Sequence, residues 1–211
     1  LQHSIDGGSL KFDYFSPDEK NRLSVFASAA NTDRDSYYGP GNDPLKAYGK
    51  TTDLTAMGGA QYVHTFDKCF FMPSDLTAGL EYNRDRLKDN MWGYNRHTDQ
   101  TVNIYSAFLQ NEWKNDRWGI LIGGRLDKHN MVDNVIFSPR ANLRFNPTQN
   151  INLRLSYSSG FRAPQAFDED MHIENVGGTV AMIERAKDLK EEKSQSFSAS
   201  ADMYHRFGAF Q

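Results

Sequence analysis

The sequence predicts an all-β fold, an antiparallel up-and-down meander of about nine strands that forms part of a transmembrane β-barrel. Polar and apolar residues alternate in run after run, as in SPRANLRF, where every second residue is apolar. Several runs exceed ten residues, whereas strands of globular proteins average about 5–6 and transmembrane strands need about 9–11. Short turns also alternate with long polar connections, which is typical of outer-membrane barrels.

The strands follow one another with little else between them. Alternation predicts strands at 9–15, 22–31, 53–66, 75–85, 100–113, 117–129, 135–145, 151–160 and 193–204. The short connections are 16–21, 67–74, 114–116 and 146–150, and the long polar ones are 32–52, 86–99 and 161–192, with 130–134 the short member of that set. In the last long connection, Val180, Ile183, Ala186 and Leu189 recur at spacing three after Thr179, a plausible N-cap, which predicts a short helix.

The hairpin from 135 to 160 shows how the two faces differ. The expected pairs are Phe145 with Ile151, Leu143 with Leu153, Ala141 with Leu155, Arg144 with Asn152, Asn142 with Arg154 and Arg140 with Ser156. One face is therefore apolar and the other polar, which suits either a soluble sandwich or a barrel in lipid. Pro139 inside this run predicts a strand end, a bulge or an edge, because proline donates no main-chain hydrogen bond.

Composition narrows the class of protein. The 211 residues are 38% hydrophobic and 13% aromatic, too aromatic for a disordered chain, and the net charge of −3 is spread without a basic patch for nucleic acid. The chain has no run of 18 apolar residues, so the sequence predicts no membrane-spanning helix. Cys69 is the single cysteine and cannot form an internal disulfide. The N-terminal LQHSIDGG has no signal-peptide features, and both ends suggest a piece of a longer mature protein.

Two groups of residues are candidates for binding. Aromatic and hydrogen-bonding residues in the long connections suit capture of a small rigid ligand, or else they pack the loops together or lie at the headgroups. The ligand candidates are Tyr37, Tyr38, Trp92, Tyr94, Arg96 and Arg162. The segment AFDEDMHIENVGG offers Asp168, Asp170, His172 and Glu174 to a cation such as calcium, the alternative being a solvated acidic loop. No other cofactor is expected, and the scattered histidines form no catalytic set.

The stretch SPRANLRFNPTQNINLRLSYSSGFRAP at 138–164 resembles the late barrel of TonB-dependent outer-membrane receptors. AFLQNEWKNDRWGILIGGRLD at 107–127 is similar to that family's preceding hairpin, and DLKEEKSQSF at 188–197 to its next strand entry, with Glu191 where the family often has proline. The resemblance is firm over 100–204 and is carried only by pattern and order over 9–99. It implies that residues 1–211 are a fragment of a barrel of about 22 strands, with the plug domain and the remaining strands absent.

The resemblance also implies a function. Such receptors import a scarce nutrient (an iron chelate, haem, cobalamin or a glycan) across the outer membrane of a Gram-negative bacterium, driven by TonB through the plug, without catalysis. Membrane lipid, the small ligand and an accessory lipoprotein would be partners, and nucleic acid would not. The alternatives are a soluble β-sandwich that binds glycans and an outer-membrane barrel enzyme. Excised from its barrel, the fragment would self-associate through open edges and an apolar face.

Overall fold

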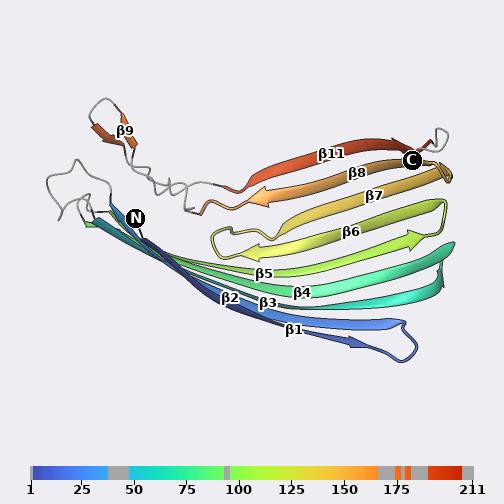
Figure 1. The fold of residues 1–211 in the computed structure, drawn as a ribbon, viewed down its shortest axis with the longest axis horizontal. Helices are drawn as coiled ribbons and strands as arrows, with labels where there is room; N and C mark the ends of the chain where they lie inside the picture. Colours follow the sequence, from blue (N-terminus) through green and yellow to red (C-terminus); the bar gives the residue numbers. More distant parts are fainter. Residues whose placement is uncertain are drawn as a thin grey trace.

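The computed structural model describes residues 2–37, 48–92, 96–165, 174–176, 179–181 and 190–205. The strands are β1 Gln2–Phe15, β2 Asn21–Tyr37, β3 Tyr48–Cys69, β4 Met72–Met91, β5 Arg96–Lys114, β6 Trp118–His129, β7 Ile136–Thr148, β8 Ile151–Arg162, β9 Glu174–Val176, β10 Thr179–Ala181 and β11 Glu192–Met203. Nine of them form one curved antiparallel sheet in the order β1 to β8 and then β11, with each strand beside the next (Figure 1). The predicted nine-stranded meander is confirmed, and β1 and β11 leave the sheet open at both edges.

The strands are longer than the alternation predicted. β2 to β5 contain 17, 22, 20 and 19 residues, so the segments predicted as loops at 32–52 and 86–99 are mostly strand. The apolar signal ends where both faces of a strand carry polar side chains, yet the main-chain ladder continues because it does not depend on side-chain polarity. The prediction therefore ended each strand at the edge of the apolar band, although the strand itself continues.

The predicted helix is wrong where it can be checked. Thr179–Ala181 forms β10 and pairs with β9 in a separate two-stranded sheet, and residues 182–189 lie outside the described residues. The pattern of apolar residues at every third position was too short to outweigh the free energy of cross-strand pairing. Within the described residues, no helix has the length and apolarity needed to cross a membrane.

The hairpin of β7 and β8 has the predicted faces but different partners. Phe145 pairs with Leu153 and Leu143 with Leu155, two residues away from the expected register. The shift arises because β7 continues to Thr148 through a bulge after Phe145, so the turn is shorter than expected. A shift of two keeps every side chain on its face, which explains why the faces were predicted correctly.

The new register changes two details of this hairpin. Arg144 now faces Arg154, but Arg144 donates to the carbonyl oxygen of Asn115 at 2.8 Å and Arg154 pairs with Asp202 at 3.3 Å, so the two cations have separate partners. The β7–β8 ladder ends at Arg140, so Pro139 stands just beyond its end, where its missing donor costs no bond to β8.

The outward face of the sheet is apolar and uncovered. Leu80 is 66% exposed and Leu155 is 55% exposed, and Leu109, Ile122 and Phe197 share this face with similar exposure. No second layer packs against these side chains in the described part of the chain, so the structure does not support the soluble sandwich. An apolar face of this extent is typical of the lipid-facing side of a membrane β-barrel.

Aromatic pairs bound this face at both ends. At the short-turn end Trp113 stacks on Phe71 and Trp118 stacks on Phe145, with ring centroids 5.7 and 4.2 Å apart. At the other end the ring centroids of Tyr82 and Tyr105 are 4.9 Å apart. Tyr105 and Trp113 are eight residues apart on β5. At about 3.4 Å per residue and a tilt of about 40°, the band between the aromatic pairs is about 21 Å tall, close to the roughly 25 Å band of outer-membrane barrels.

Candidate functional site

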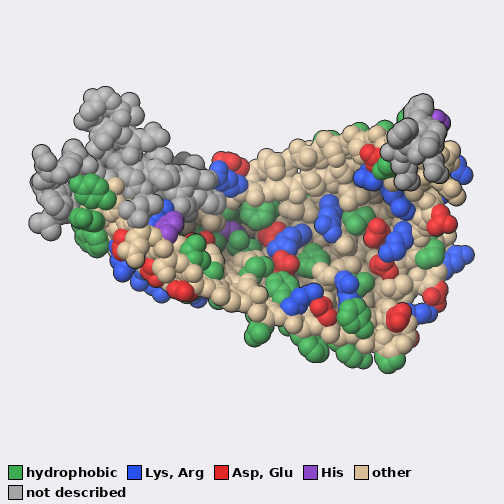
Figure 2. Space-filling view, viewed as in Figure 1, with side chains coloured by type: hydrophobic (Ala, Val, Ile, Leu, Met, Phe, Trp, Pro, Cys, Tyr) green, Lys and Arg blue, Asp and Glu red, His purple; other side chains and the backbone are tan. Residues whose placement is uncertain are grey.

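The inward face of the same strands is polar, and its charges are paired. Arg125 donates to Glu81 at 2.5 Å and to Asp127 at 2.8 Å, and Ser106 donates to Asp127 at 2.6 Å. These side chains come from β4, β5 and β6, and Figure 2 shows acidic and basic side chains interspersed over this face of the sheet. This group of one cation and two carboxylates holds three neighbouring strands together.

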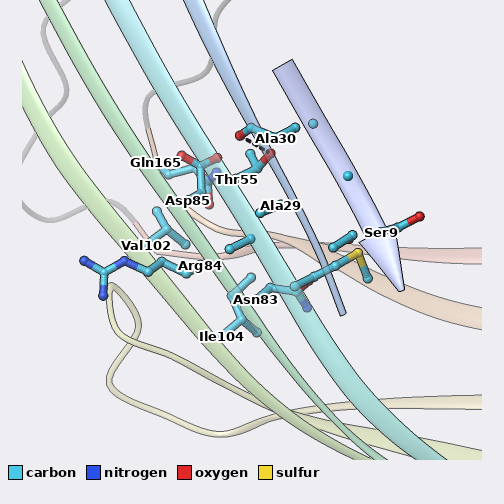
Figure 3. Close-up of a pocket in the computed structure, with 15 residues that line it drawn as sticks. Ser9, Ala29, Ala30, Thr55, Asn83, Arg84, Asp85, Val102, Ile104 and Gln165 are labelled. Atoms are coloured by element: carbon cyan, nitrogen blue, oxygen red, sulfur yellow. Dashed lines mark hydrogen bonds between the residues drawn. The ribbon is translucent and has the colours of Figure 1, made fainter. Parts of the chain in front are cut away.

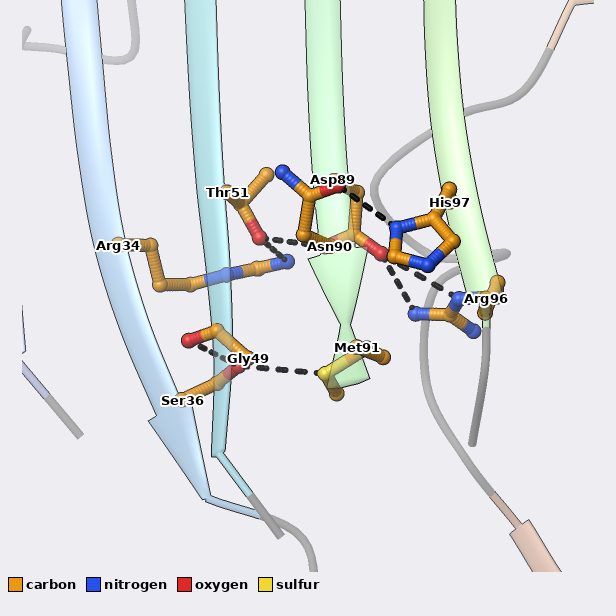
Figure 4. A network of polar contacts seen from close by, with 9 residues as sticks. All are labelled: Arg34, Ser36, Gly49, Thr51, Asp89, Asn90, Met91, Arg96 and His97. Carbon is orange, nitrogen blue, oxygen red and sulfur yellow. Dashed lines mark hydrogen bonds and ion pairs between the residues drawn. The ribbon is translucent and has the colours of Figure 1, made fainter. Parts of the chain in front are cut away.

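A second group, which we term the mouth network, lies inward at the long-connection end of β2 to β5 and consists of Arg34, Thr51, Asp89 and Arg96 (Figure 4). Arg96 donates to Asp89 through both Nη2 at 2.9 Å and Nε at 3.3 Å. Thr51 donates to the other carboxylate oxygen at 2.6 Å and accepts from Arg34 at 3.3 Å. Because Asp89 is 1% exposed and the Arg96 side chain 14%, this pair is shielded from water. Through Thr51 and Arg34 the whole network ties four strands together.

Met91 fills the space next to this network. It is 1% exposed and accepts a long contact of 3.9 Å from the Ser36 hydroxyl. A Cβ added to Gly49 would lie 1.9 Å from the Met91 sulfur, so only glycine lets β3 and this side chain come so close. Side chains at this end of the sheet are thus buried, although several of them, such as Ser36 and Thr51, are polar.

Between these two networks the inward face is hollowed. The hollow has a volume of about 610 Å³ and is lined by β1 to β5, with small residues such as Gly7, Ser9, Ser28 and Ala30 on one side and Val102 and Ile104 on the other (Figure 3). Gln165, from the segment after β8, also lines it and contacts the ring of buried His129 at 3.2 Å. Ala163 packs with Val132 and Ile136, so the segment Ala163–Gln165 folds inward over the sheet.

An apolar outward band, a polar inward face and long strand extensions at one end are together typical of an outer-membrane β-barrel. The sequence matches the family described as "TonB dependent receptor-like, beta-barrel" over residues 2–211. The chain belongs to this TonB-dependent receptor family. No curated protein matches the chain.

Solved structures of similar fold agree with the family. The siderophore receptor PirA from Acinetobacter baumannii has a TM-score of 0.71 at 18% identity, over 96% of this chain and 33% of that protein. The G324V mutant of the ferric enterobactin receptor PfeA from Pseudomonas aeruginosa has a TM-score of 0.74 at 18% identity, over 96% and 32%. The ferric-catecholate import receptor Fiu from E. coli K12 has a TM-score of 0.66 at 10% identity, over 95% and 38%. The chain thus spans about a third of the receptors that it resembles.

The predicted ligand residues of this TonB-dependent receptor barrel that the structure describes are Tyr37, Trp92, Arg96 and Arg162, and they do not share one face. Arg96 is inward, in the mouth network, whereas Tyr37 and Trp92 occupy the positions that alternate with the buried ones, and both are exposed. Tyr37 contacts Tyr48 edge-on at 5.1 Å, and Arg162 ends β8 opposite Glu192. Tyr38, Tyr94, Asp168, Asp170 and His172, and the side chain of Glu174, lie outside the described residues. The ligand and calcium sites therefore stay predictions.

Sequence reasoning missed Arg34, Thr51 and Asp89 as functional candidates in the receptor wall. All three lie in segments that were predicted to be loops. Alternation of buried and exposed positions continues through Arg34, Asp35, Ser36 and Tyr37, but the buried members are polar. Neither hydrophobicity nor side-chain size alternates through these four residues, so no local pattern could have revealed the network.

Proposed function

We propose that this chain forms part of the wall and outer extensions of an outer-membrane receptor that imports a small, scarce nutrient, with TonB supplying the energy through a plug domain. The observation that supports this most directly is the coexistence of a lipid-facing apolar band and a charged inward face on the same strands. The similar structures are named as siderophore and ferric-catecholate receptors, which makes an iron chelate the first ligand class to test. The chain transports and does not catalyse.

The geometry supports a specific role for the strand extensions. Beyond Tyr82, β4 continues for nine residues to Met91, about 30 Å along the strand at roughly 3.4 Å per residue. The mouth network fixes this extension to β2, β3 and β5, so the wall stands as a rigid rim above the membrane. A ligand that enters from outside would pass this rim and then the hollow, where small side chains leave room beside polar Asn83 and Asp85.

The predicted binding residues extend this proposal. Tyr38, Tyr94 and Arg162 would contact the nutrient from the connections above the rim, and Asp168, Asp170, His172 and Glu174 would hold calcium that orders the segment after β8. An accessory lipoprotein would bind the same outer end. Addition of a calcium chelator should then increase proteolysis of the full-length receptor between β8 and β11, and unchanged cleavage would reject the calcium site.

Uptake in cells tests the import function. The gene for the full-length protein is deleted in the source bacterium, and growth and uptake of radioactive iron are measured with ferric catecholates, hydroxamates, citrate or haem as the sole iron source, with cobalamin uptake measured separately. Loss of one substrate, restored by the wild-type gene, is expected. Unchanged uptake of every substrate, or recovery of the protein outside the outer-membrane fraction, would contradict the proposal.

A further inference from the structure

The hollow between the two inward networks has the size and the lining of a ligand pocket. Its volume of about 610 Å³ lies within the range of pockets that enclose small molecules, roughly 300–1,000 Å³. Val102, which is buried, and Ile104 make one side of it apolar, while the serines and glycines of β1 and β2 leave the space open (Figure 3). The hollow therefore has room for an alkyl chain beside its polar groups.

Asp85 brings an unpaired negative charge to this hollow. It shares the inward side of β4 with buried Leu87, and its carboxylate has no hydrogen bond or ion pair within the part of the chain that the structure describes. Register places Thr55 of β3 and Val102 of β5 on either side of it, and neither is charged. Because a partly buried carboxylate is costly without a partner, Asp85 favours a cation in the hollow.

The cations nearest the hollow are already paired, and carboxylates outnumber them. Arg96 pairs with Asp89 in the mouth network, and Arg125 pairs with two carboxylates in the other network. From one network to the other, the inward charged residues of β2 to β6 are the cations Arg34, Arg96 and Arg125 and the carboxylates Asp53, Glu81, Asp85, Asp89 and Asp127. This part of the wall therefore carries a negative balance, which attracts cations and repels anions such as ferric catecholates.

We propose that the imported ligand is an iron chelate that carries a protonated amine, with the ammonium group bound at Asp85 and its alkyl chain along Val102 and Ile104. An ammonium group donates charge-assisted hydrogen bonds to a carboxylate, and these are stronger than bonds between neutral groups. Thr55 and Asn83 line the same hollow and offer further acceptor oxygens. This inference rests on the proposed import function and names the substrate class of that site.

Two chelates that differ in one charge test the proposal. Ferrioxamine B is a linear ferric trihydroxamate that ends in a primary ammonium group, and its N-acetylated form lacks this charge while the iron centre is unchanged. Binding of both forms, and of a ferric tricatecholate, to the purified full-length receptor in detergent is measured by quenching of tryptophan fluorescence. The test variant is Asp85→Asn, the charge-conserving variant is Asp85→Glu, and the control is Asp35→Asn, which removes an exposed carboxylate outside the hollow.

The wild-type receptor should bind the ammonium form about tenfold more tightly than the acetylated form, as expected for one hydrogen bond to a charged group. Asp85→Asn should lose this preference and keep its affinity for the acetylated form. Asp85→Glu and Asp35→Asn should keep the preference. Because the Asp85 carboxylate has no partner in the described wall, Asp85→Asn should fold as the wild type does, which the gel mobility of the folded barrel checks.

Equal binding of the two forms by the wild type, binding of neither, an equal loss of preference in Asp35→Asn, or tighter binding of the tricatecholate would overturn the proposal. A cation of the plug that occupied Asp85 would produce the first of these results, so the full-length receptor is the required sample. Uptake of another chelate in cells would still support the import function if this preference were absent. Loss of import with the preference intact would leave the binding inference standing.

Discussion

Gly58 and Gly59 of β3 are adjacent, but they face opposite sides of the sheet, and alanine should affect them differently. A Cβ at Gly59 would lie 2.8 Å from the main-chain oxygen of Leu80 and 2.8 Å from Cζ of Phe26. A Cβ at Gly58 would meet only the oxygen of Phe26 at 3.5 Å, an ordinary contact. The ring of Phe26 can move, but the oxygen of Leu80 belongs to the β3–β4 ladder and cannot move without breaking it.

Overpacking of this kind costs about 1–3 kcal/mol, so Gly59→Ala should destabilise the barrel by that amount. Gly58→Ala should change stability little or raise it by about 0.4–1 kcal/mol, because alanine restricts the unfolded chain. Phe26→Ala combined with Gly59→Ala should restore only part of the loss, since the Leu80 oxygen remains.

The assay is thermal and urea unfolding of the full-length receptor in lipid vesicles, followed by tryptophan fluorescence and by the gel mobility of the folded barrel. The unfolding midpoint of Gly59→Ala should fall clearly below those of the wild type and Gly58→Ala. If both glycine variants lose the same stability, loss of backbone freedom rather than the close contact is the cause, and the reasoning fails.

Three further predictions concern the membrane face, the mouth network and a turn. Leu155→Arg should cost about 2–4 kcal/mol in lipid and Ser156→Arg much less, because only the first faces the hydrocarbon; equal losses by the same unfolding assay would contradict the assignment of faces. Asp89→Asn should cost about 3–5 kcal/mol by leaving Arg96 without its buried carboxylate, whereas Asp99→Asn, at an exposed pair, should cost under about 1 kcal/mol; similar values would show that the mouth network is solvated. The Ser16 hydroxyl and the Lys20 amide, both donating to Asp18, hold the pKa of Asp18 below its usual value. The lowered pKa stabilises the folded state above about pH 4, and this contribution is lost as pH falls through the folded pKa, so the gap in thermal midpoint between wild type and Asp18→Asn should close in acid; a gap independent of pH would contradict it.

Much of this fold could be predicted because alternation at period two is a local property of the chain. The pattern predicted nine strands and their order, and it placed Leu153 and Leu155 on the opposite face from Arg154 and Ser156. A fragment such as SYSSGFRAP was also enough to suggest the receptor family, which the match over residues 2–211 confirms. The positions of the strands and the face of each side chain stay the same when a strand shifts by two residues against its neighbour.

The candidate site depended on non-local contacts that no local pattern encodes. The bulge after Phe145 changed the partners of β8, and the ladders of β2 to β5 continued beyond the apolar band. Only that continuation brings Arg34, Thr51, Asp89 and Arg96 together from four strands, up to 62 residues apart in sequence. The sequence by itself determined which face of each strand meets lipid, because side-chain alternation is set residue by residue. Tertiary structure decided how far the strands rise and which charges meet, because cross-strand pairing sets both.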